Sequence, residues 1–422
     1  MRRSLFGSRR IVTGVLSAVL AATPLSLSEA QDPATGAWPQ WRGPSRTGQI
    51  EPTTWPDSLD ESHLSEVWRV ELGPSYSGPI VADGKVFVTE TVDKQDERVT
   101  AYSVADGSKL WSVSWPGAMS VPFFAKANGD WIRATPAYAD GRLYVAGMRD
   151  VLVCLDANDG HELWRFDFPE RLGTPLPDFG FVCSPMIDGE HLLVQAGGGF
   201  VKIDRATGEL VWRVLDDGGG MMGSAFSSPV RAKIRGVDQY VVQTREKLCG
   251  VAVDDGRLLW EQTVPAFRGM NILTPTVLGD RIFTSAYGGE SFCYELANDG
   301  EWKVSTVWSG KWQGYMSSPV VVGEHLYLHQ RNQRLVCLGV ADGAEAWTTK
   351  PFGKYWSLVA NGNRLLALDE TGKLLLIDAD PAEFRLVSTR EVATSETWAH
   401  LAVVGDLLFV RSLDGLIVFR WK

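Results

Sequence analysis

Short apolar segments of four to six residues recur along the whole chain, and turns separate them. Residues 85–88, 142–145 and 325–328 read Lys-Val-Phe-Val, Arg-Leu-Tyr-Val and His-Leu-Tyr-Leu. Runs of this kind, rich in β-branched and aromatic residues, are typical of β-strands. Asp-Gly pairs lie in many of the turns, and glycine there supplies the positive φ of a tight hairpin. The density of glycine, β-branched residues and hairpin turns excludes a helical solenoid.

The strands and turns form a repeat that ends on a tryptophan. Five clear copies share an Asp-Gly or Thr-Gly pair, with the tryptophan four residues after the glycine. These copies end at Trp111, Trp164, Trp212, Trp260 and Trp347. A weaker copy has Asp299-Gly300 and then Trp308. Each large indole is expected to fill the space between neighbouring sheets.

The starts of the copies are equally regular. Each start joins a small residue to a proline, which loses no needed donor at the beginning of a strand. The starts are Gly78-Pro79, Thr135-Pro136, Ser184-Pro185, Ser228-Pro229, Thr274-Pro275 and Ser318-Pro319, with successive prolines 57, 49, 44, 46 and 44 residues apart. Two degenerate copies begin near Trp356 and Trp398. Eight copies of four short strands predict an all-β fold, an eight-bladed β-propeller of four-stranded antiparallel blades.

The two ends of the repeat array are expected to meet. The last copy stops after three strands, at residues 416–419. Residues 66–70 read Glu-Val-Trp-Arg-Val and resemble the end of a repeat without its beginning. We expect this N-terminal strand to complete the eighth blade and close the ring, because an open ring would expose two sheet edges. The propeller is therefore predicted to span residues 64–422, after a leader at residues 31–63.

The first thirty residues have the layout of a secretory signal. Four arginines precede an apolar stretch at residues 11–22, and Ser28-Glu29-Ala30 supplies small residues before the expected cut. Residues 1–30 are therefore predicted to be a signal peptide, and the protein to be periplasmic or extracellular. Arg9-Arg10 partly matches a twin-arginine signal, so that route and ordinary secretion both stay open. No cysteine lies near the cut, so no lipid anchor is expected.

Charge and composition narrow the classes of partner. The 422-residue chain carries a net charge of −10, and loss of residues 1–30, with four arginines and one glutamate, would leave −13. An acidic chain of this kind repels phosphate backbones, which argues against nucleic-acid binding. After residue 30, no run approaches the roughly 18 apolar residues of a membrane span. The five cysteines fall mostly inside apolar strands and are expected to be buried thiols.

The tryptophan repeat resembles that of the quinoprotein, or PQQ-like, β-propeller family. The leader Trp38-Pro39-Gln40-Trp41-Arg42-Gly43-Pro44 also looks like the leader of exported bacterial members. The family includes the pyrroloquinoline-quinone (PQQ) alcohol dehydrogenases and the propeller subunit of the outer-membrane assembly machinery. The resemblance covers about residues 64–422 and implies an eight-bladed ring, and PQQ and calcium are cofactors that it alone implies.

Two departures from the family pattern limit what can be transferred. The dehydrogenases place two adjacent cysteines against the quinone and hold calcium through acidic and amide side chains, and the chain has no adjacent cysteines and no matching acidic set. The assembly subunit carries a lipidated cysteine after its signal, and this chain lacks one there. The leader's two tryptophans are expected to pack along the side of the propeller, the alternative being an anchor to a neighbouring protein.

The connections that lead into the inner strands should surround the mouth of the central channel. They are rich in aromatic residues and methionine, carry a few cations, and suit a peptide or protein partner or a small planar ligand. The candidate residues of this ligand- or partner-binding face are Tyr76, Trp131, Arg133, Phe181, Met222, Phe226, Arg268, Asn271, Trp312, Tyr315, Lys354, Trp356 and Trp398. The alternative is that the aromatic residues pack on their own blades and the lysines are solvated.

Groups for catalysis or metal binding do not stand out. Residues 216–220 lack the fixed spacing of a phosphate or calcium loop. His325 and His329 could share one side of a strand, but His191 occupies the same repeat position as His325, which indicates a strand-start preference. No catalytic or metal-binding residue is predicted. The expected function is a non-catalytic binding or scaffold propeller at the cell envelope, and the alternative is a PQQ- and calcium-dependent oxidoreductase of an alcohol or sugar.

Overall fold

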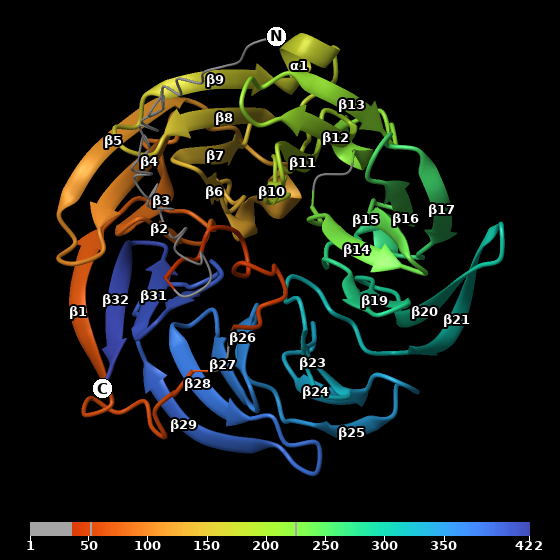
Figure 1. Cartoon of the computed structure of the whole chain (residues 1–422). Coiled ribbons are helices and arrows are strands. Elements are labelled where there is room, and N and C mark those ends of the chain that lie inside the picture. The colour runs from red at the N-terminus through yellow and green to blue at the C-terminus, as the bar shows by residue number, and fades with distance from the viewer. Residues whose placement is uncertain (1–35, 51–52, 224–225) are drawn as a thin grey trace, which may run out of the picture. The chain divides into compact units, whose positions relative to one another are not determined.

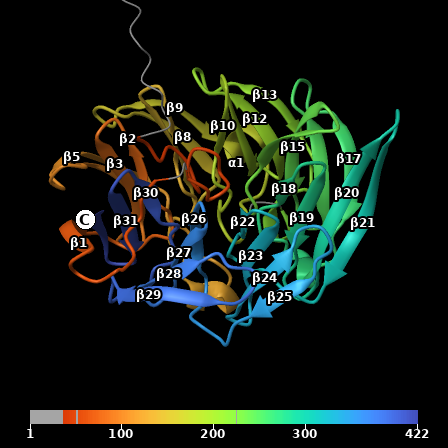
Figure 2. The same cartoon turned by 60° about the horizontal axis from the view of Figure 1, so that its bottom comes forward.

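The chain forms eight antiparallel sheets that follow one another in a ring. The structure, a computed structural model, describes residues 36–50, 53–223 and 226–422. Each sheet has four strands, and the sheets succeed one another around the ring in chain order (Figure 1, Figure 2). The predicted eight-bladed β-propeller is confirmed. The predicted signal peptide at residues 1–30, and the first residues of the leader, lie outside the described residues.

We number the blades in chain order and give their strands from the innermost outward. Blades one to four comprise β2 (Ile80–Ala82), β3 (Lys85–Val92), β4 (Asp96–Ser103) and β5 (Lys109–Pro116); β6 (Ala137–Ala139), β7 (Arg142–Gly147), β8 (Val151–Asp156) and β9 (Glu162–Asp167); β10 (Met186–Asp188), β11 (His191–Ala196), β12 (Gly199–Asp204) and β13 (Leu210–Val214); and β14 (Val230–Ile234), β15 (Val237–Gln243), β16 (Lys247–Ala252) and β17 (Leu258–Thr263).

The other four blades have the same order. They comprise β18 (Thr276–Leu278), β19 (Arg281–Ser285), β20 (Ser291–Asn298) and β21 (Trp302–Gly310); β22 (Val320–Val322), β23 (His325–His329), β24 (Leu335–Gly339) and β25 (Glu345–Thr348); β26 (Ser357–Asn361), β27 (Arg364–Leu368), β28 (Lys373–Asp378) and β29 (Arg385–Glu391); and β30 (Ala402–Val404), β31 (Leu407–Ser412), β32 (Gly415–Trp421) and the N-terminal β1 (Leu64–Glu71).

The eighth blade draws its strands from both ends of the chain. β1 pairs antiparallel with β32, from Leu64 opposite Trp421 to Glu71 opposite Gly415. Figure 1 shows β1 outside β32, beside blade one. A strand from the beginning of the chain therefore occupies the outermost position of the sheet formed by its end.

Every outermost strand carries a β-bulge. In blade two, Cys154 lies opposite Trp164 while Leu155 lies opposite Glu162, so Leu163 has no partner. A register shift recurs at the outer strand pair of all eight blades. The bulge sends the extra residue toward solvent, where the Leu163 side chain is 42% exposed.

The tryptophan of one blade docks on the glycine turn of the next. Trp111 of blade one covers Gly160 of blade two, where an added Cβ would lie 2.6 Å from the indole ring. The Trp111 Nε1 donates to the carbonyl oxygen of Ala157 at 3.1 Å. The same ring-on-glycine contact joins Trp68 to Gly107, Trp164 to Gly208, Trp212 to Gly256 and Trp308 to Gly343. The glycine and tryptophan of the repeat thus form one contact between blades.

The junction of blades four and five departs from this pattern. Trp260 donates its Nε1 to Gln239 within its own blade, at 2.6 Å. A Cβ on Gly300 of blade five would meet no atom within 4 Å. Blade five has a longer outer hairpin, so its glycine lies too far out to receive a tryptophan. This geometry accounts for the weaker copy of the repeat.

Helices are short and sit in the connections between blades. They are α1 (Phe168–Leu172) and the 3-10 turns η1 (Phe123–Asn128), η2 (Gly220–Met222) and η3 (Phe267–Gly269). Within the described ranges, no helix has the length and apolar character needed to cross a membrane. All five cysteines are free and buried, as their apolar strand positions predicted.

Candidate functional site

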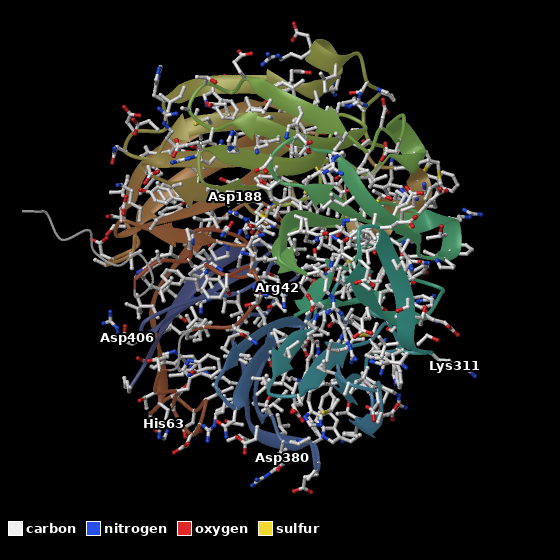
Figure 3. The ribbon with its side chains drawn as sticks, turned by 45° about the vertical axis from the view of Figure 1, so that its right-hand side comes forward. Arg42, His63, Asp188, Lys311, Asp380 and Asp406 are labelled. Atoms are coloured by element: carbon white, nitrogen blue, oxygen red, sulfur yellow. The ribbon has the colours of Figure 1, made fainter. Side chains whose placement is uncertain are left out.

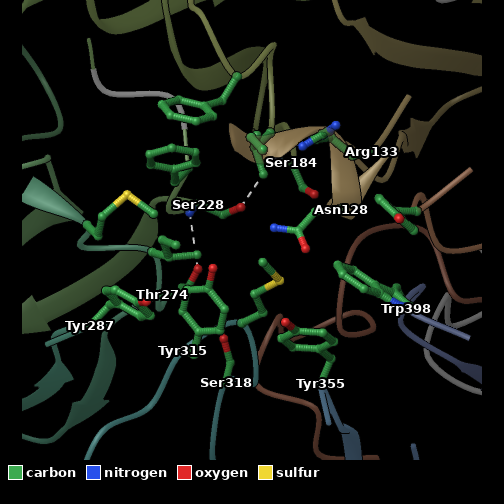
Figure 4. Close-up of a pocket in the computed structure, with 18 of the residues that line it drawn as sticks. Asn128, Arg133, Ser184, Ser228, Thr274, Tyr287, Tyr315, Ser318, Tyr355 and Trp398 are labelled. Carbon is green, nitrogen blue, oxygen red and sulfur yellow. Dashed lines mark hydrogen bonds between the residues drawn. The ribbon is translucent and has the colours of Figure 1, made fainter. Parts of the chain in front are cut away.

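One large cavity lies where the connections enter the inner strands. Its volume is about 790 Å³, and connections into all eight blades contribute to its lining. We call this cavity the funnel, and Figure 4 shows part of its wall. The short turns η1, η2 and η3 place Phe124, Met222 and Phe267 on it, with 47–55% of each side chain exposed. The wall is therefore largely apolar and open to solvent.

A set of hydroxyl groups in the funnel wall links the inner strands. The backbone N–H of Thr135 donates to Ser184 Oγ at 3.0 Å, and that of Ser184 donates to Ser228 Oγ at 3.0 Å. The N–H of Ser228 then donates to Thr274 Oγ1 at 3.1 Å (Figure 4). Each of these residues precedes the proline of a repeat start. The Ser/Thr-Pro pair therefore supplies a hydrogen bond between neighbouring blades as well as a strand start.

The leader crosses the channel beside the funnel. Trp38 exchanges backbone hydrogen bonds with Val81 of β2 and is 2% exposed. Arg46 donates to the carbonyl oxygens of Pro185 at 2.8 Å and Ser184 at 3.2 Å, and Arg42 donates to that of Pro319. Figure 3 places Arg42 near the centre of the ring.

This position differs from the predicted packing along the side of the propeller. The carbonyl groups at the start of several inner strands face the channel, where they have no neighbouring strand to pair with. Arginine supplies several N–H donors to such groups from one side chain. The chemistry of the inner strands therefore draws the leader into the channel, where Trp41 becomes part of the funnel lining.

The funnel is positively charged, although the chain is acidic. Arg42 and Arg46 are buried and form no ion pair within the described residues. Burial, and then the nearby Arg46, lower the pKa of Arg42 to about 9, so it stays charged at neutral pH. Burial, and then Arg42, lower the pKa of His400 to about 3, so that imidazole is neutral. Arg133, Arg245 and Arg268 add positive charge to the lining, which contains no acidic residue in the described chain.

Five aromatic rings form a continuous row along the funnel. Ring centroids are 4.7 Å apart for Tyr287 and Tyr315, 5.8 Å for Tyr315 and Tyr355, 4.2 Å for Tyr355 and Trp398, and 4.6 Å for Trp398 and Tyr76. We call this set the aromatic row, and Figure 4 shows its first four members side by side. An arginine lies over each end, Arg331 at 4.2 Å from the Tyr287 ring and Arg133 at 5.9 Å from the Tyr76 ring.

Comparison with known proteins places this propeller in a family. A family model described as outer membrane protein assembly factor BamB matches residues 58–123 and 95–349, well over half of the chain. The chain belongs to this family. The predicted resemblance to PQQ-like repeat propellers is thereby confirmed.

Individual relatives have low sequence identity to this chain, but the similarity extends over most of its length. The outer membrane protein assembly factor BamB of Shewanella oneidensis is 22% identical over 383 residues, which covers 86% of this chain and 91% of the relative. The quinohemoprotein alcohol dehydrogenase ADH-IIG of Pseudomonas putida is 26% identical over 303 residues, 65% of this chain and 40% of that enzyme. The crystal structure of BamB from Moraxella catarrhalis superposes with a TM-score of 0.62 at 14% identity, covering 85% of this chain and 98% of that one.

The structure brings most of the sequence-predicted face together in this BamB-family propeller. The predicted residues that line the funnel are Tyr76, Arg133, Met222, Phe226, Arg268, Tyr315, Trp356 and Trp398. Lys354 lines a smaller adjoining cavity. Lys311, a cation of the same connections, lies at the outer edge of the ring in Figure 3. The connections before the prolines therefore do converge, as expected from the repeat.

Four predicted residues do not line the funnel. Phe181 is fully buried in the core between blades two and three, and packs edge-on against Phe168. Asn271 is 1% exposed and donates to the carbonyl oxygens of Arg245 and Val264, so it fastens its own connection. Trp312 donates to Glu345 of the outermost strand β25, and Trp131, whose backbone carbonyl is bound by Arg133, places its side chain beside Tyr76 of the aromatic row. Phe181, Asn271 and Trp312 therefore follow the alternative, in which side chains of the connections pack on the blades, whereas Trp131 lies at the rim of the funnel.

Sequence reasoning missed several residues of the funnel. Arg245 and Tyr287 lie in hairpins after the second strand of their blades, not in the connections that were searched. Trp41 was assigned to the outside of the ring. The hydroxyl residues were visible in the sequence as the small residue of every repeat start after the first, which has Gly78. Their regular position before proline was the signal that could have identified them.

The funnel does not fit the calcium site implied by the dehydrogenase relatives. Calcium takes six to eight oxygen ligands, commonly carboxylates. None of the described lining residues is acidic, and the described residues contain no group of three His, Cys, Asp or Glu able to hold a metal ion. The chain also has no pair of adjacent cysteines. The residues of the funnel therefore do not supply the ligands that a calcium-bound quinone needs.

Proposed function

We propose that this protein is an exported, non-catalytic binding propeller of the cell envelope, whose funnel holds an extended peptide segment of a protein partner. The observation that supports this proposal best is the funnel wall, where exposed aromatic and methionine side chains from separate blades meet and where none of the described lining residues is acidic. The name of its BamB relatives, an assembly factor for outer membrane proteins, supports a scaffold role at the envelope. Export, through the predicted signal at residues 1–30, is part of the proposal.

The apolar wall is continuous enough to receive side chains of a peptide. Phe124 lies 6.2 Å from Phe179, and Phe179 lies 5.4 Å from Phe226, between ring centroids. Met222, 47% exposed, lines the same side of the cavity. Soluble proteins seldom expose large contiguous apolar patches, and those that do commonly bind a partner there. Unbranched methionine adapts to different side chains, which suits a site for varied sequences.

The test is a peptide array of extended segments from envelope proteins, followed by titration of the bound peptides. The variant Met222→Asp places a charge in the funnel. Its matched control is Leu110→Asp, since Leu110 is 48% exposed on an outermost strand. We expect micromolar binding by wild type, about tenfold weaker binding by Met222→Asp, and unchanged binding by the control. Absence of any peptide binding, or an equal loss of affinity in both variants, would contradict the proposal.

A quinone-dependent oxidoreductase is the second candidate. The aromatic row and the arginines of the funnel favour a planar anionic molecule, and the volume falls within the usual range of about 300–1,000 Å³ for small-molecule sites. The lack of acidic lining residues opposes it. Addition of PQQ and calcium to purified protein distinguishes the two candidates. We expect no dye-linked oxidation of alcohols or sugars, and robust oxidation would favour the enzyme.

A further inference from the structure

A second, smaller cavity adjoins the funnel between blades five, six and seven. Its volume is about 250 Å³. It shares Tyr287, Tyr315, Met316 and Tyr355 with the funnel lining, so the two cavities meet at the start of the aromatic row. We call it the side pocket. Its remaining lining residues are all polar or charged: Ser317, His329, Gln330, Arg331 and Lys354.

The side pocket contains two cations, Arg331 and Lys354. Arg331 and Lys354 are both exposed, and neither side chain forms an ion pair within the described residues. The Arg331 guanidinium lies over the Tyr287 ring at 4.2 Å from its centroid. This cation–π contact positions the group while leaving its N–H donors unused. Glu370 lies close to Lys354: its carboxylate accepts from the backbone N–H of Lys354 and is attracted by the Lys354 charge, but it does not line the pocket.

A buried histidine also lines the side pocket. His329 is 2% exposed, stacks on Trp356 at a centroid distance of 4.6 Å, and lies close to the backbone carbonyl groups of Phe352, Gly353 and Gln333. Burial lowers the pKa of His329 to about 4, so the ring is neutral and can place its one proton on either nitrogen.

The pocket therefore combines positive charge with hydroxyl and amide groups in a small space. Burial raises the pKa of Tyr315 to about 12, so its hydroxyl keeps its proton and can donate. Arginine and lysine with such donors match a carboxylate, which accepts several hydrogen bonds at once. A space of about 250 Å³ has room for a single carboxylate group and its nearest atoms rather than for a second chain segment. The apolar residues next to that carboxylate would pack against the adjoining aromatic row.

We propose that the side pocket is a carboxylate site, in which Arg331 and Lys354 bind a carboxylate of the peptide whose apolar residues lie in the funnel. The inference rests on the proposed function of the funnel and names the chemistry it selects. The carboxylate comes either from the free C-terminus of the peptide or from an aspartate or glutamate beside an aromatic residue. The two sources present the same group to the same cations.

The experiment compares matched ligands on full-length protein by titration calorimetry. One aromatic-rich peptide is used with a free C-terminus and as its C-terminal amide, and a second, amidated peptide carries an internal Glu or Gln. We expect the preferred carboxylate form to bind about tenfold more tightly than its neutral form. Selectivity between free acid and amide identifies the C-terminus as the source, and selectivity between Glu and Gln identifies the side chain.

The variants Arg331→Gln and Lys354→Gln test the residues, with Lys303→Gln, exposed on the outermost strand β21, as control. Each pocket variant should lose most of the selectivity for the carboxylate, while the control keeps it. Peptides that bind wild type equally well in charged and neutral forms would overturn the carboxylate site and leave the peptide-binding funnel intact.

A small-molecule experiment tests the carboxylate site independently of whether the funnel binds a peptide. Phenylacetate and phenylacetamide differ only in the carboxylate, and their binding is measured by quenching of tryptophan and tyrosine fluorescence. Phenylacetate binding that is lost in Arg331→Gln supports the side pocket even if no peptide binds. Equal behaviour of acid and amide, together with no peptide binding, overturns both proposals.

Discussion

The docking of tryptophan on glycine makes a sharp prediction about stability. We consider Gly160→Ala, with Gly141→Ala in the same blade as its control. Both glycines have positive φ, 79° and 76°, so alanine meets similar backbone strain at the two sites, about 1–2 kcal/mol. A Cβ at Gly160 would lie 2.6 Å from the Trp111 ring, whereas one at Gly141 would meet nothing within 4 Å. Forcing the ring away should add about 1–3 kcal/mol at Gly160 alone.

The assay is urea unfolding at equilibrium, followed by tryptophan fluorescence, on the two variants and on Trp111→Ala. We expect the midpoint to fall for Gly160→Ala at least twice as far as for Gly141→Ala. In the Trp111→Ala background the extra loss at Gly160 should vanish, because the ring that it strikes is gone. Equal midpoints for the two glycine variants, or an extra loss that persists without Trp111, would refute the docking argument.

Three further predictions concern the wall, the leader and a buried carboxylate. Ser228→Ala removes the acceptor of the Ser184 N–H and should lower the free energy of unfolding by about 1–3 kcal/mol in urea titrations. Ser228→Thr keeps a hydroxyl acceptor and should keep the wild-type stability. Trp38→Ala should cost about 3–5 kcal/mol in the same titrations, since this buried indole ties the leader to the channel; a loss below about 1 kcal/mol would contradict that position. Asp150 is 1% exposed, and burial raises its pKa to about 7 from the ordinary 3.8, so the folded state keeps a proton that the unfolded state releases. Stability should therefore fall as pH rises from about 4 to about 7. Asp150→Asn should reduce that fall and raise the urea midpoint at about pH 8. An unchanged pH profile in the variant would contradict this role of Asp150.

The fold was predictable because the same local signals recur in nearly every blade. A Gly turn followed by tryptophan specifies both a hairpin and an interblade contact, so its spacing along the chain maps onto the ring. The β-bulge beside the tryptophan was not visible, because a single extra residue such as Leu163 does not disturb an apolar pattern that is already short. The departure at Trp260 was visible only in the next copy of the repeat, where Gly300 and Trp308 have a changed spacing.

The location of the site was predictable from the sequence, but the residues that line it were only partly so. The connections before each proline do converge, since all inner strands begin at the same end of the ring. Whether a given aromatic residue points into the funnel depends on the backbone of an irregular loop, which sequence spacing does not specify. Phe181 and Asn271 turn into their blades for this reason, while Tyr287, from a hairpin, reaches across to Tyr315.

The leader links the fold to the site through charge. Arg42 and Arg46 are fixed by carbonyl groups of the inner strands, so their positive charges stay in the channel without a carboxylate to neutralise them. Moving a charge into a buried site is costly unless something compensates, and here neutral carbonyl oxygens and the ring of Trp41 do so. An anionic group in the funnel would therefore be attracted by the arginines of the leader as well as by those of the funnel wall. The leader that crosses the channel thus favours a ligand that carries negative charge, in agreement with the carboxylate site proposed for the side pocket.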